Sequence, residues 1–283
     1  MDGTLLNGRH TVSEETVQLI KDAQNSGIEF LVATGRAYNE ARYVLDQVNI
    51  KCPAICVNGG EIRDENGNIE FAVSLDGKVC KEIEKVFNEL NIYFELYTEK
   101  GTYTMDEDMG VEIVTDIYHS ANPSEDRAAI RQVAKGRFLE GLIDSIDSYD
   151  KLFIEGEGSV YKFLAFALDE ELLKEVQNRL REIEGVEVTS SGRNNIEVMH
   201  KEARKGTALQ RFVESKGISL QDTMALGDNY NDISMLSIVG HSVAMGNAEQ
   251  PVKDIAKAVT DTNSNDGVAQ MIKKALAQQN LVK

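Results

Sequence analysis

The chain has 283 residues, of which 42% are hydrophobic and 27% charged. This composition excludes a disordered or fibrous protein, and the length favours two domains or a core with a large insertion. The formal charge of −17 at pH 7 argues against nucleic acid or an anionic membrane as partner, and it means that any phosphate site needs a local cation, either a bound metal or a placed lysine.

The start of the chain alternates helices with short apolar strands. Ser13 is a candidate N-cap for a helix that ends near Gly27, and the apolar run 28–33 then predicts a strand. A second helix over 38–48 precedes another apolar run, 53–57. Helices alternating with nearly continuous apolar strands indicate a parallel sheet covered on both faces.

The middle third of the chain has a different pattern, in which strands, helices and hairpins are mixed. The predicted elements are a hairpin over 61–73 about Asn66-Gly67, a helix over 79–90, paired strands over 92–97 and 102–105, an acidic stretch of irregular helix to about 148, a strand over 161–167 and a helix capped by Asp169. This mixture indicates an α+β insertion.

The alternating pattern resumes after residue 186. Lys205-Gly206 opens a helix, and strands are predicted over 196–199, 223–226, 242–245 and 258–260. We therefore predict an α/β fold with a doubly wound parallel-sheet core, similar to a Rossmann fold. The predicted core comprises residues 1–76 and 187–283, and the inserted α/β cap comprises residues 77–186.

Four polar clusters follow the ends of predicted strands: Asp2-Gly3-Thr4, Thr34-Gly35-Arg36, Asn58-Gly59-Gly60 and the loop 227–232. Ligands of open α/β sheets bind at the carboxyl ends of the strands, so we expect these clusters to converge on one crevice. Taken singly, each cluster has an ordinary structural explanation as a turn, a helix cap or an Asx-rich loop. Arg36 and Asn58 are candidate substrate contacts, and pairing with an acidic neighbour is an equal alternative for Arg36.

In their order along the chain, these motifs resemble the haloacid dehalogenase superfamily, and specifically its Cof-type phosphatases with a C2-type α/β cap. Asp2-Gly3-Thr4 is similar to the end of the family's first motif, Asp-x-Asp-Gly-Thr, and Thr34 in VATGR matches the second. Lys205 in ARKGTAL matches the third motif, and GDNYND, from Gly227 to Asp232, matches the fourth. VAMGNA and DGVAQMI are also similar to the family's sequences, so the resemblance covers essentially the whole chain.

The resemblance implies a phosphatase that works through an aspartyl-phosphate. The implied catalytic residues are Asp2, as general acid and base, with Thr34 and Lys205 acting on the phosphoryl oxygens. The implied contacts to phosphate or substrate are Met1, Thr34, Gly35, Arg36, Asn58, Lys205 and Asn231. Mg²⁺ is the implied cofactor, held by Asp228 and the Asp2 carbonyl, with Asp232 steering these ligands from behind or, alternatively, serving only as a helix cap.

The nucleophile is the first aspartate of the family's first motif, and Met1 follows the place where it belongs. We therefore expect an Asp directly before Met1, at the end of a central strand. Either Met1 is an internal residue mistaken for a start, or the numbering begins late. The expected activity is hydrolysis of a small phosphomonoester, such as a sugar phosphate, a nucleotide like flavin mononucleotide (FMN), or a riboflavin-pathway intermediate. A phosphosugar mutase, or a non-catalytic phospho-ligand-binding protein that lacks the nucleophile, are the alternatives.

Cys52, Cys56 and Cys80 are odd in number and lack metal-ligand spacing, so we expect reduced, mostly buried thiols. The sequence shows neither an apolar run long enough to span a bilayer nor a signal peptide, and a cytoplasmic protein is expected. The expected partner is a small phosphorylated metabolite, with neither nucleic acid nor membrane, and the protein is expected to be a monomer or a homodimer.

Overall fold

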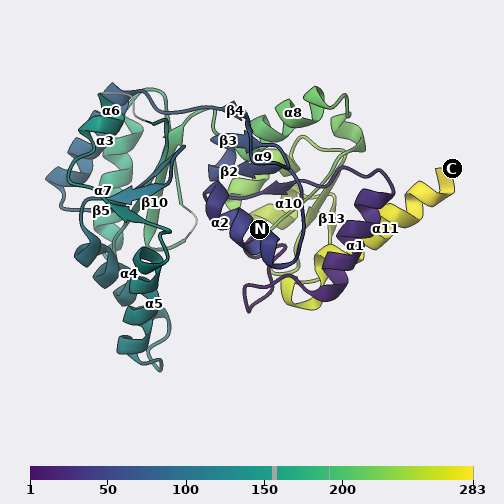
Figure 1. Cartoon of the computed structure of the whole chain (residues 1–283), viewed down its shortest axis with the longest axis horizontal. Coiled ribbons are helices and arrows are strands. Elements are labelled where there is room, and N and C mark those ends of the chain that lie inside the picture. The colour runs from purple at the N-terminus through teal and green to yellow at the C-terminus, as the bar shows by residue number, and fades with distance from the viewer. Residues whose placement is uncertain (155–157, 191, 283) are drawn as a thin grey trace. The chain divides into compact units, whose positions relative to one another are not determined.

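The computed structural model describes residues 1–154, 158–190 and 192–282, with side chains of the last helix through Gln278. It divides into two compact units (Figure 1): unit 1 comprises Met1–Ala72 and Arg204–Lys283, and unit 2 comprises Val73–Ala203. In the described part, no helix is both long and apolar enough to cross a membrane.

The strands of unit 1 form two short sheets. They are β1 (Val32–Ala33), β2 (Ala54–Cys56), β3 (Glu61–Arg63), β4 (Ile69–Ala72), β11 (Met224–Gly227), β12 (His241–Ala244) and β13 (Ala258–Val259). The first sheet has the order β1-β2-β3-β4, with β1 and β2 parallel, and the second has the order β11-β12-β13, with all strands parallel. As a result, β1 and β11 are each an outer strand of their own sheet.

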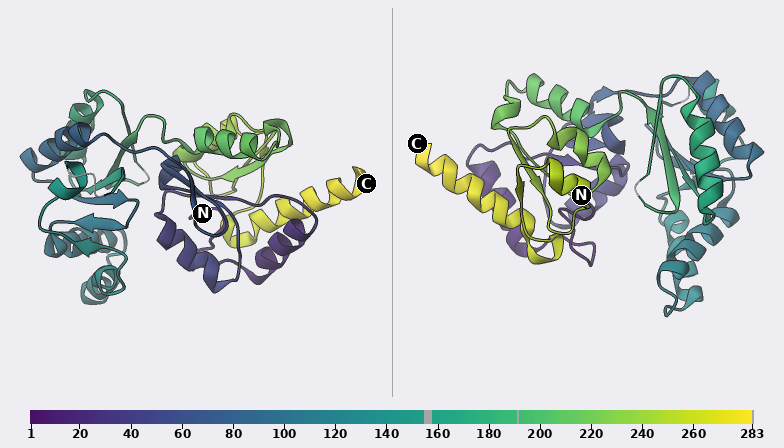
Figure 2. Two further views of the ribbon diagram at one scale, coloured as in Figure 1. Left: turned by 45° about the horizontal axis from the view of Figure 1, so that its top comes forward. Right: turned by 180° about the vertical axis from the view of Figure 1, so that it is seen from behind.

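Helices of unit 1 lie on both sides of these strands (Figure 2), with α1, α2 and α11 on one side and α8 on the other. They are α1 (Glu14–Asn25), α2 (Tyr38–Gln47), α8 (Lys205–Ser215), α9 (Ile233–Leu236), α10 (Gln250–Ile255) and α11 (Gly267–Val282), with 3₁₀ turns η1 (Val57–Gly59), η2 (Leu220–Asp222), η3 (Tyr230–Asp232) and η4 (Asn263–Asn265). This covering of both faces is the arrangement predicted from the alternating pattern.

Local signals in the sequence account for most of these elements. The Ser13 side chain accepts a hydrogen bond from the Thr16 backbone and caps α1, as predicted. Of the predicted strand 28–33, only Val32–Ala33 is paired. The predicted hairpin forms between β3 and β4, although of the two turn residues Asn66 and Gly67 only Gly67 has a positive φ.

The described residues of unit 2 form one sheet of six strands. They are β5 (Tyr93–Thr98), β6 (Thr102–Thr104), β7 (Asp144–Ser145), β8 (Val160–Phe166), β9 (Val186–Thr189) and β10 (Asn195–His200), in the order β7-β6-β5-β8-β10-β9. Its helices are α3 (Gly77–Glu89), α4 (Glu107–Ala121), α5 (Arg127–Leu139), α6 (Asp150–Phe153) and α7 (Glu170–Arg181). The acidic stretch predicted as irregular helix thus contains two regular helices, α4 and α5.

The core of unit 2 lies between one face of this sheet and two of its helices. Phe163 of β8 and Val198 of β10 pack in the same apolar cluster as Phe87 of α3 and Val176 of α7. Burial of these side chains is the main stabilising contribution to the unit.

The predicted boundary after the insertion is wrong, because unit 2 extends to Ala203 and includes strand β10. The sequence predicts residues 187–203 as part of the core, but β10 pairs antiparallel with β8 and β9 and belongs to unit 2. A short apolar run is compatible with a strand of either sheet, because only the partner strand distinguishes the two. The first boundary also lies earlier than predicted, at Ala72 rather than residue 76.

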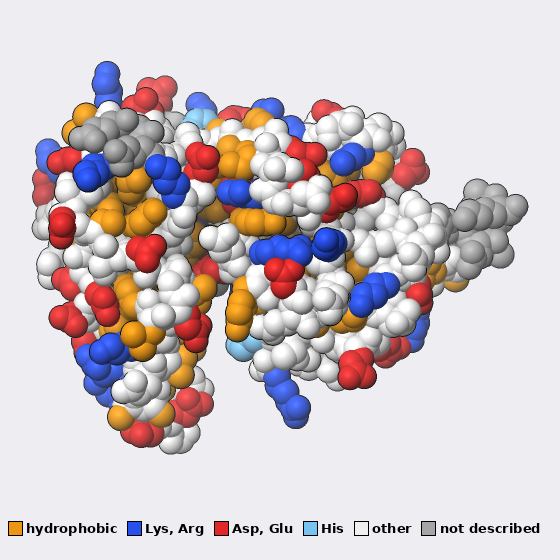
Figure 3. Space-filling view, viewed as in Figure 1, with side chains coloured by type: hydrophobic (Ala, Val, Ile, Leu, Met, Phe, Trp, Pro, Cys, Tyr) orange, Lys and Arg blue, Asp and Glu red, His pale blue; other side chains and the backbone are white. Residues whose placement is uncertain are grey.

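On the face shown in Figure 3, acidic and basic side chains are interspersed on each unit.

Candidate active site

The fourth predicted cluster packs directly against the first. The Thr4 hydroxyl donates to Asp228 Oδ1 at 2.6 Å. Gly3 has φ +66°, and a Cβ at this position would lie 2.1 Å from Asp228 Oδ2, so only glycine leaves room for the carboxylate. Burial, opposed by the Thr4 hydrogen bond and reinforced by the charge of Asp232, raises the pKa of Asp228 above its usual value.

The second cluster reaches the first through an ion pair. Arg36 Nε donates to Asp2 Oδ2 at 2.8 Å, and its Nη2 donates to Asp2 Oδ1 at 2.5 Å. Burial by itself would raise the pKa of Asp2, but the hydrogen bonds and charge of Arg36 outweigh it, and the pKa lies below its usual value. Of the two interpretations of Arg36, the structure shows pairing with an acidic neighbour.

Lys205 and Asp232 form a buried ion pair beside these loops. Lys205 Nζ lies 2.6 Å from Asp232 Oδ1, and the two side chains are only 4% and 5% exposed. Asp232 Oδ2 accepts the backbone N–H groups of Asp228 and Asn229 at 2.9 and 3.1 Å. Burial alone would raise the pKa of Asp232, but the charge and hydrogen bond of Lys205 lower it. Both oxygens of Asp232 therefore face protein donors.

Thr34, Asn58 and Asn231 complete the cluster. Thr34 is buried at the end of β1, and its Oγ1 accepts the Arg36 backbone N–H at 3.1 Å, which leaves the hydroxyl proton available to donate. The Asn231 side-chain amide donates to Asn58 Oδ1 at 3.0 Å. Hydrogen bonds or steric contacts thus link all four predicted clusters, and Lys205 joins them through Asp232.

The donors at this site suit a hard divalent cation. Asp228 Oδ1 accepts the Thr4 hydroxyl, and no donor among the described residues reaches Asp228 Oδ2. A cation beside this oxygen would offset the burial and the Asp232 charge that raise the pKa of Asp228. The described residues include no group of three or more His, Cys, Asp or Glu side chains that could hold a metal ion. The Asp228 carboxylate, with Oδ2 facing no described donor, fits Mg²⁺, which binds to proteins through few carboxylates and keeps several waters.

A cavity of about 680 Å³ lies in unit 1 next to these loops. Its lining is largely apolar and includes Val32 and Ala33 of β1, Ala225 and Leu226 of β11, and Phe212 of α8. Met1 also lines it, with its nitrogen 3.5 Å from the Ala33 carbonyl oxygen. The cavity therefore separates the two outer strands, β1 and β11, at the point where the chain enters the first cluster.

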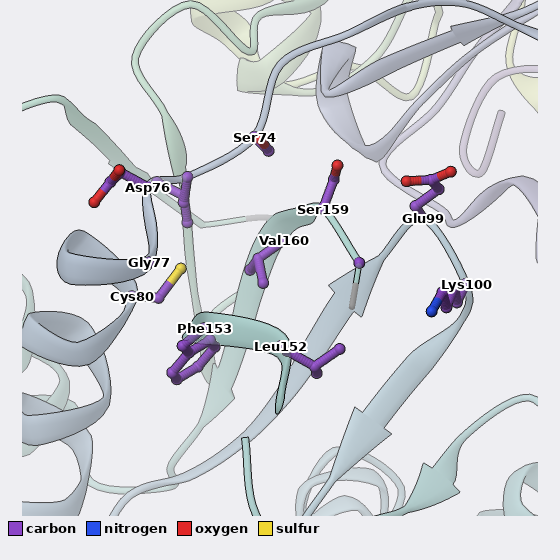
Figure 4. Close-up of a pocket in the computed structure, with 12 residues that line it drawn as sticks. Ser74, Asp76, Gly77, Cys80, Glu99, Lys100, Leu152, Phe153, Ser159 and Val160 are labelled. Carbon is purple, nitrogen blue, oxygen red and sulfur yellow. The ribbon is translucent and has the colours of Figure 1, made fainter. Parts of the chain in front are cut away.

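Unit 2 contains a second cavity, of about 510 Å³ (Figure 4). Its lining combines apolar side chains with exposed polar ones and includes Cys80, Phe153 and Val160 together with Ser74, Glu99 and Lys100. Charges of both signs lie at its rim, and none of the predicted catalytic residues lines it. The motif residues therefore identify the site in unit 1.

Several contributing residues were not assigned from the sequence. Asn247 Nδ2 donates to the Gly3 carbonyl at 2.8 Å and so fixes the first loop. Thr4 orients Asp228, and Gly59 approaches the Arg204 backbone so closely that a Cβ would lie 2.5 Å from its carbonyl oxygen. Asn247 belongs to the VAMGNA stretch, which was the one available signal for its role.

Comparison with known proteins places the chain in a family. A family model described as haloacid dehalogenase-like hydrolase matches residues 1–272. The chain is 36% identical to "Phosphatase YwpJ" of Bacillus subtilis, covering 98% of each chain, and 35% identical to "5-amino-6-(5-phospho-D-ribitylamino)uracil phosphatase YwtE" of Bacillus subtilis, covering 99% of this chain and 97% of the relative. A solved haloacid dehalogenase-like hydrolase from B. subtilis has a TM-score of 0.84, with 36% identity and 96% of each chain covered. The chain therefore belongs to the haloacid dehalogenase-like hydrolase family of enzymes, and the family, fold class and enzyme class predicted from its motifs are confirmed.

Proposed function

We propose that the protein is a Mg²⁺-dependent hydrolase of a small phosphomonoester. The observation that carries this proposal is the linked cluster of strand-end loops in unit 1, which gathers Asp2, Thr34, Lys205 and Asp228. A buried lysine and a cation beside Asp228 would together create an anion site within an acidic protein. A cytoplasmic location is part of this proposal, and the three cysteines are free and buried.

The proposed reaction has two steps. The phosphoryl group passes from the substrate oxygen to the proposed nucleophilic Asp before Met1, while Asp2 donates a proton to the leaving alcohol. Water then attacks the aspartyl-phosphate, Asp2 accepts a proton from this water, and inorganic phosphate is released. The Thr34 hydroxyl and the Gly35 backbone N–H hold phosphoryl oxygens, Lys205 neutralises their charge, and Asn231 adds an amide donor. Arg36 holds the Asp2 carboxylate through two hydrogen bonds.

Asp228 and the backbone carbonyl of Asp2 are the proposed metal ligands. Asp232 orients the loop that carries Asp228 and does not bind the metal itself, because its own oxygens accept hydrogen bonds from Lys205 and from two backbone N–H groups. Bound Mg²⁺ supplies positive charge that stabilises the phosphoryl oxygens in the transition state.

The proposed nucleophile is an Asp that directly precedes Met1. The apolar cavity between β1 and β11 supports this placement, because a strand running parallel to both would fill it and join the two sheets. Such a strand would end beside Met1, which the family's first motif places next to the nucleophile. The mass of the N-terminal peptide of the protein from its native cell tests this part: a peptide that extends upstream through Asp supports it, and one that begins at Met1 contradicts it.

The proposed substrate is a phosphorylated metabolite of the size of a sugar phosphate, a nucleotide such as FMN, or a riboflavin-pathway intermediate. The third possibility is supported by the B. subtilis relative YwtE, whose name specifies a phosphorylated ribitylaminouracil. The decisive assay measures release of inorganic phosphate from a panel of such esters, with Mg²⁺ and with EDTA.

We expect phosphate release from at least one ester with Mg²⁺ and none with EDTA. Labelled phosphate that stays on the substrate would favour a mutase. Binding of phosphate without release from any ester would contradict hydrolysis and favour a ligand-binding protein.

A further inference from the structure

We infer that Asn58 is a positioning residue, which orients the Asn231 amide through a direct hydrogen bond. This inference rests on the proposed function, because it takes Asn231 as a donor to phosphate. It replaces the expectation that Asn58 itself touches substrate.

The Asn231 amide has a single anchor. Its Nδ2 donates to Asn58 Oδ1 at 3.0 Å, whereas its Oδ1 is buried and accepts no hydrogen bond from the described residues. An amide Nδ2 carries two hydrogens, so one is directed at Asn58 and the other is left for a phosphoryl oxygen. The direction of this second hydrogen therefore depends on Asn58.

The turn that carries Asn58 is itself held from several sides. Val57, Asn58 and Gly59 have φ values of 50°, 57° and 105°. A left-handed conformation is unfavourable for a β-branched residue such as Val57 and persists only where the surroundings enforce it. The Asn58 N–H donates to the Thr34 carbonyl at 2.9 Å, and the Val57 N–H donates to the Arg36 carbonyl at 2.9 Å.

Two glycines, Gly35 and Gly59, allow the close contacts that hold Asn58 in place. A Cβ on Gly35 would lie 2.8 Å from Asn58 Oδ1, so the missing side chain makes room for this amide. Gly59 lies against the Arg204 carbonyl, one residue before Lys205. The turn 57–59 therefore contacts the Thr34 loop and the Asn231 loop through Asn58, and the residue preceding Lys205 through Gly59.

Two properties of asparagine have to be separated in a test. Asn tolerates the left-handed conformation better than most residues, and its side chain also bonds Asn231. Asn58→Gly keeps the backbone conformation accessible and removes only the side chain. Asn231→Ala removes the group that Asn58 is inferred to orient.

The experiment measures the affinity of the full-length protein for inorganic phosphate in Mg²⁺ by calorimetry, for both single variants and the double variant. Each single substitution is expected to weaken phosphate binding by about tenfold, the effect of one hydrogen bond to a charged group. The double variant is expected to match Asn231→Ala alone, because Asn58 acts through Asn231. Losses that multiply in the double variant, or an unchanged affinity of Asn58→Gly, would overturn the inference.

Asn49 provides the matched control, because it is an exposed Asn with φ 53° that follows α2. Asn49→Gly is expected to leave phosphate affinity unchanged. If Asn58→Gly does not fold, Gly35→Ala serves instead, because its methyl group displaces the Asn58 amide. Gly35→Ala should weaken phosphate binding, and Gly35→Ala combined with Asn231→Ala should match Asn231→Ala alone; unchanged binding of the single variant, or losses that multiply in the double variant, would overturn the inference. Wild-type protein that binds no phosphate would refute the proposed function and this inference with it, whereas bound phosphate with multiplying losses refutes the inference alone.

Discussion

Replacing Lys205 with methionine should destabilise unit 1 strongly. The substitution removes one partner of a buried pair whose side chains are 4% and 5% exposed, and it leaves the Asp232 carboxylate without its cation. Such a loss typically costs about 3–5 kcal/mol. Because Asp232 keeps two backbone N–H donors at 2.9 and 3.1 Å, we expect the lower end, about 3 kcal/mol.

Urea unfolding followed by circular dichroism measures this change. With an m-value of about 2 kcal/mol/M, the midpoint of the unit 1 transition should fall by about 1.5 M. Lys216→Met is the matched control, because Lys216 is an exposed lysine at the end of the same helix, and it should change stability by less than about 1 kcal/mol. A loss of less than about 1 kcal/mol for Lys205→Met would refute the assignment of a buried, mutually dependent pair.

Further predictions concern Gly59, the buried cysteines and Thr4. Gly59→Ala should cost at least about 2 kcal/mol, because φ is +105° and the new Cβ meets a carbonyl oxygen at 2.5 Å; an unchanged melting temperature would contradict this. Burial raises the pKa of Cys52 and Cys80 from 9.0 to about 12, so these thiols should not react with a thiol reagent in native protein at about pH 8 and should react after denaturation. Rapid labelling of the native protein would contradict their burial. Above pH 9.0 the thiols of the unfolded chain lose their protons, whereas the buried thiols stay neutral until about pH 12, so the melting temperature should fall over this range. Thr4→Val removes the hydrogen bond to Asp228 and should weaken Mg²⁺ binding about tenfold, a change that calorimetric titration of the metal would detect or exclude.

Much of the fold could be predicted because its signals are local. The Ser13 and Asp169 caps and the apolar periodicity of the helices lie within a few residues of the elements they define. The sheet to which β10 belongs could not be predicted in this way. Its pairing with β8 and β9 depends on packing across the unit, and a short apolar run does not indicate which strands it pairs with.

The site shows the same division between local and distant information. The order of the motifs indicated which loops meet, and the contacts of Thr4 with Asp228 and of Lys205 with Asp232 agree with it. The partners of individual side chains were not predictable, because Arg36 could have met either substrate or an acid. The pairing of Asn58 with Asn231, 173 residues away along the chain, left no signal in the spacing of either motif.

We propose that the loop cluster of unit 1 hydrolyses phosphomonoesters with Mg²⁺. The most direct measurement is phosphate release by full-length wild-type protein and by Asp2→Asn, with Asp64→Asn, a half-buried aspartate of the β3–β4 turn, as the control. We expect wild type and control to release phosphate equally, and Asp2→Asn to be slower by at least about a hundredfold, because general acid–base catalysis is lost. Equal rates for Asp2→Asn and wild type would contradict the role of Asp2, and release that persists in EDTA would contradict Mg²⁺-dependent hydrolysis.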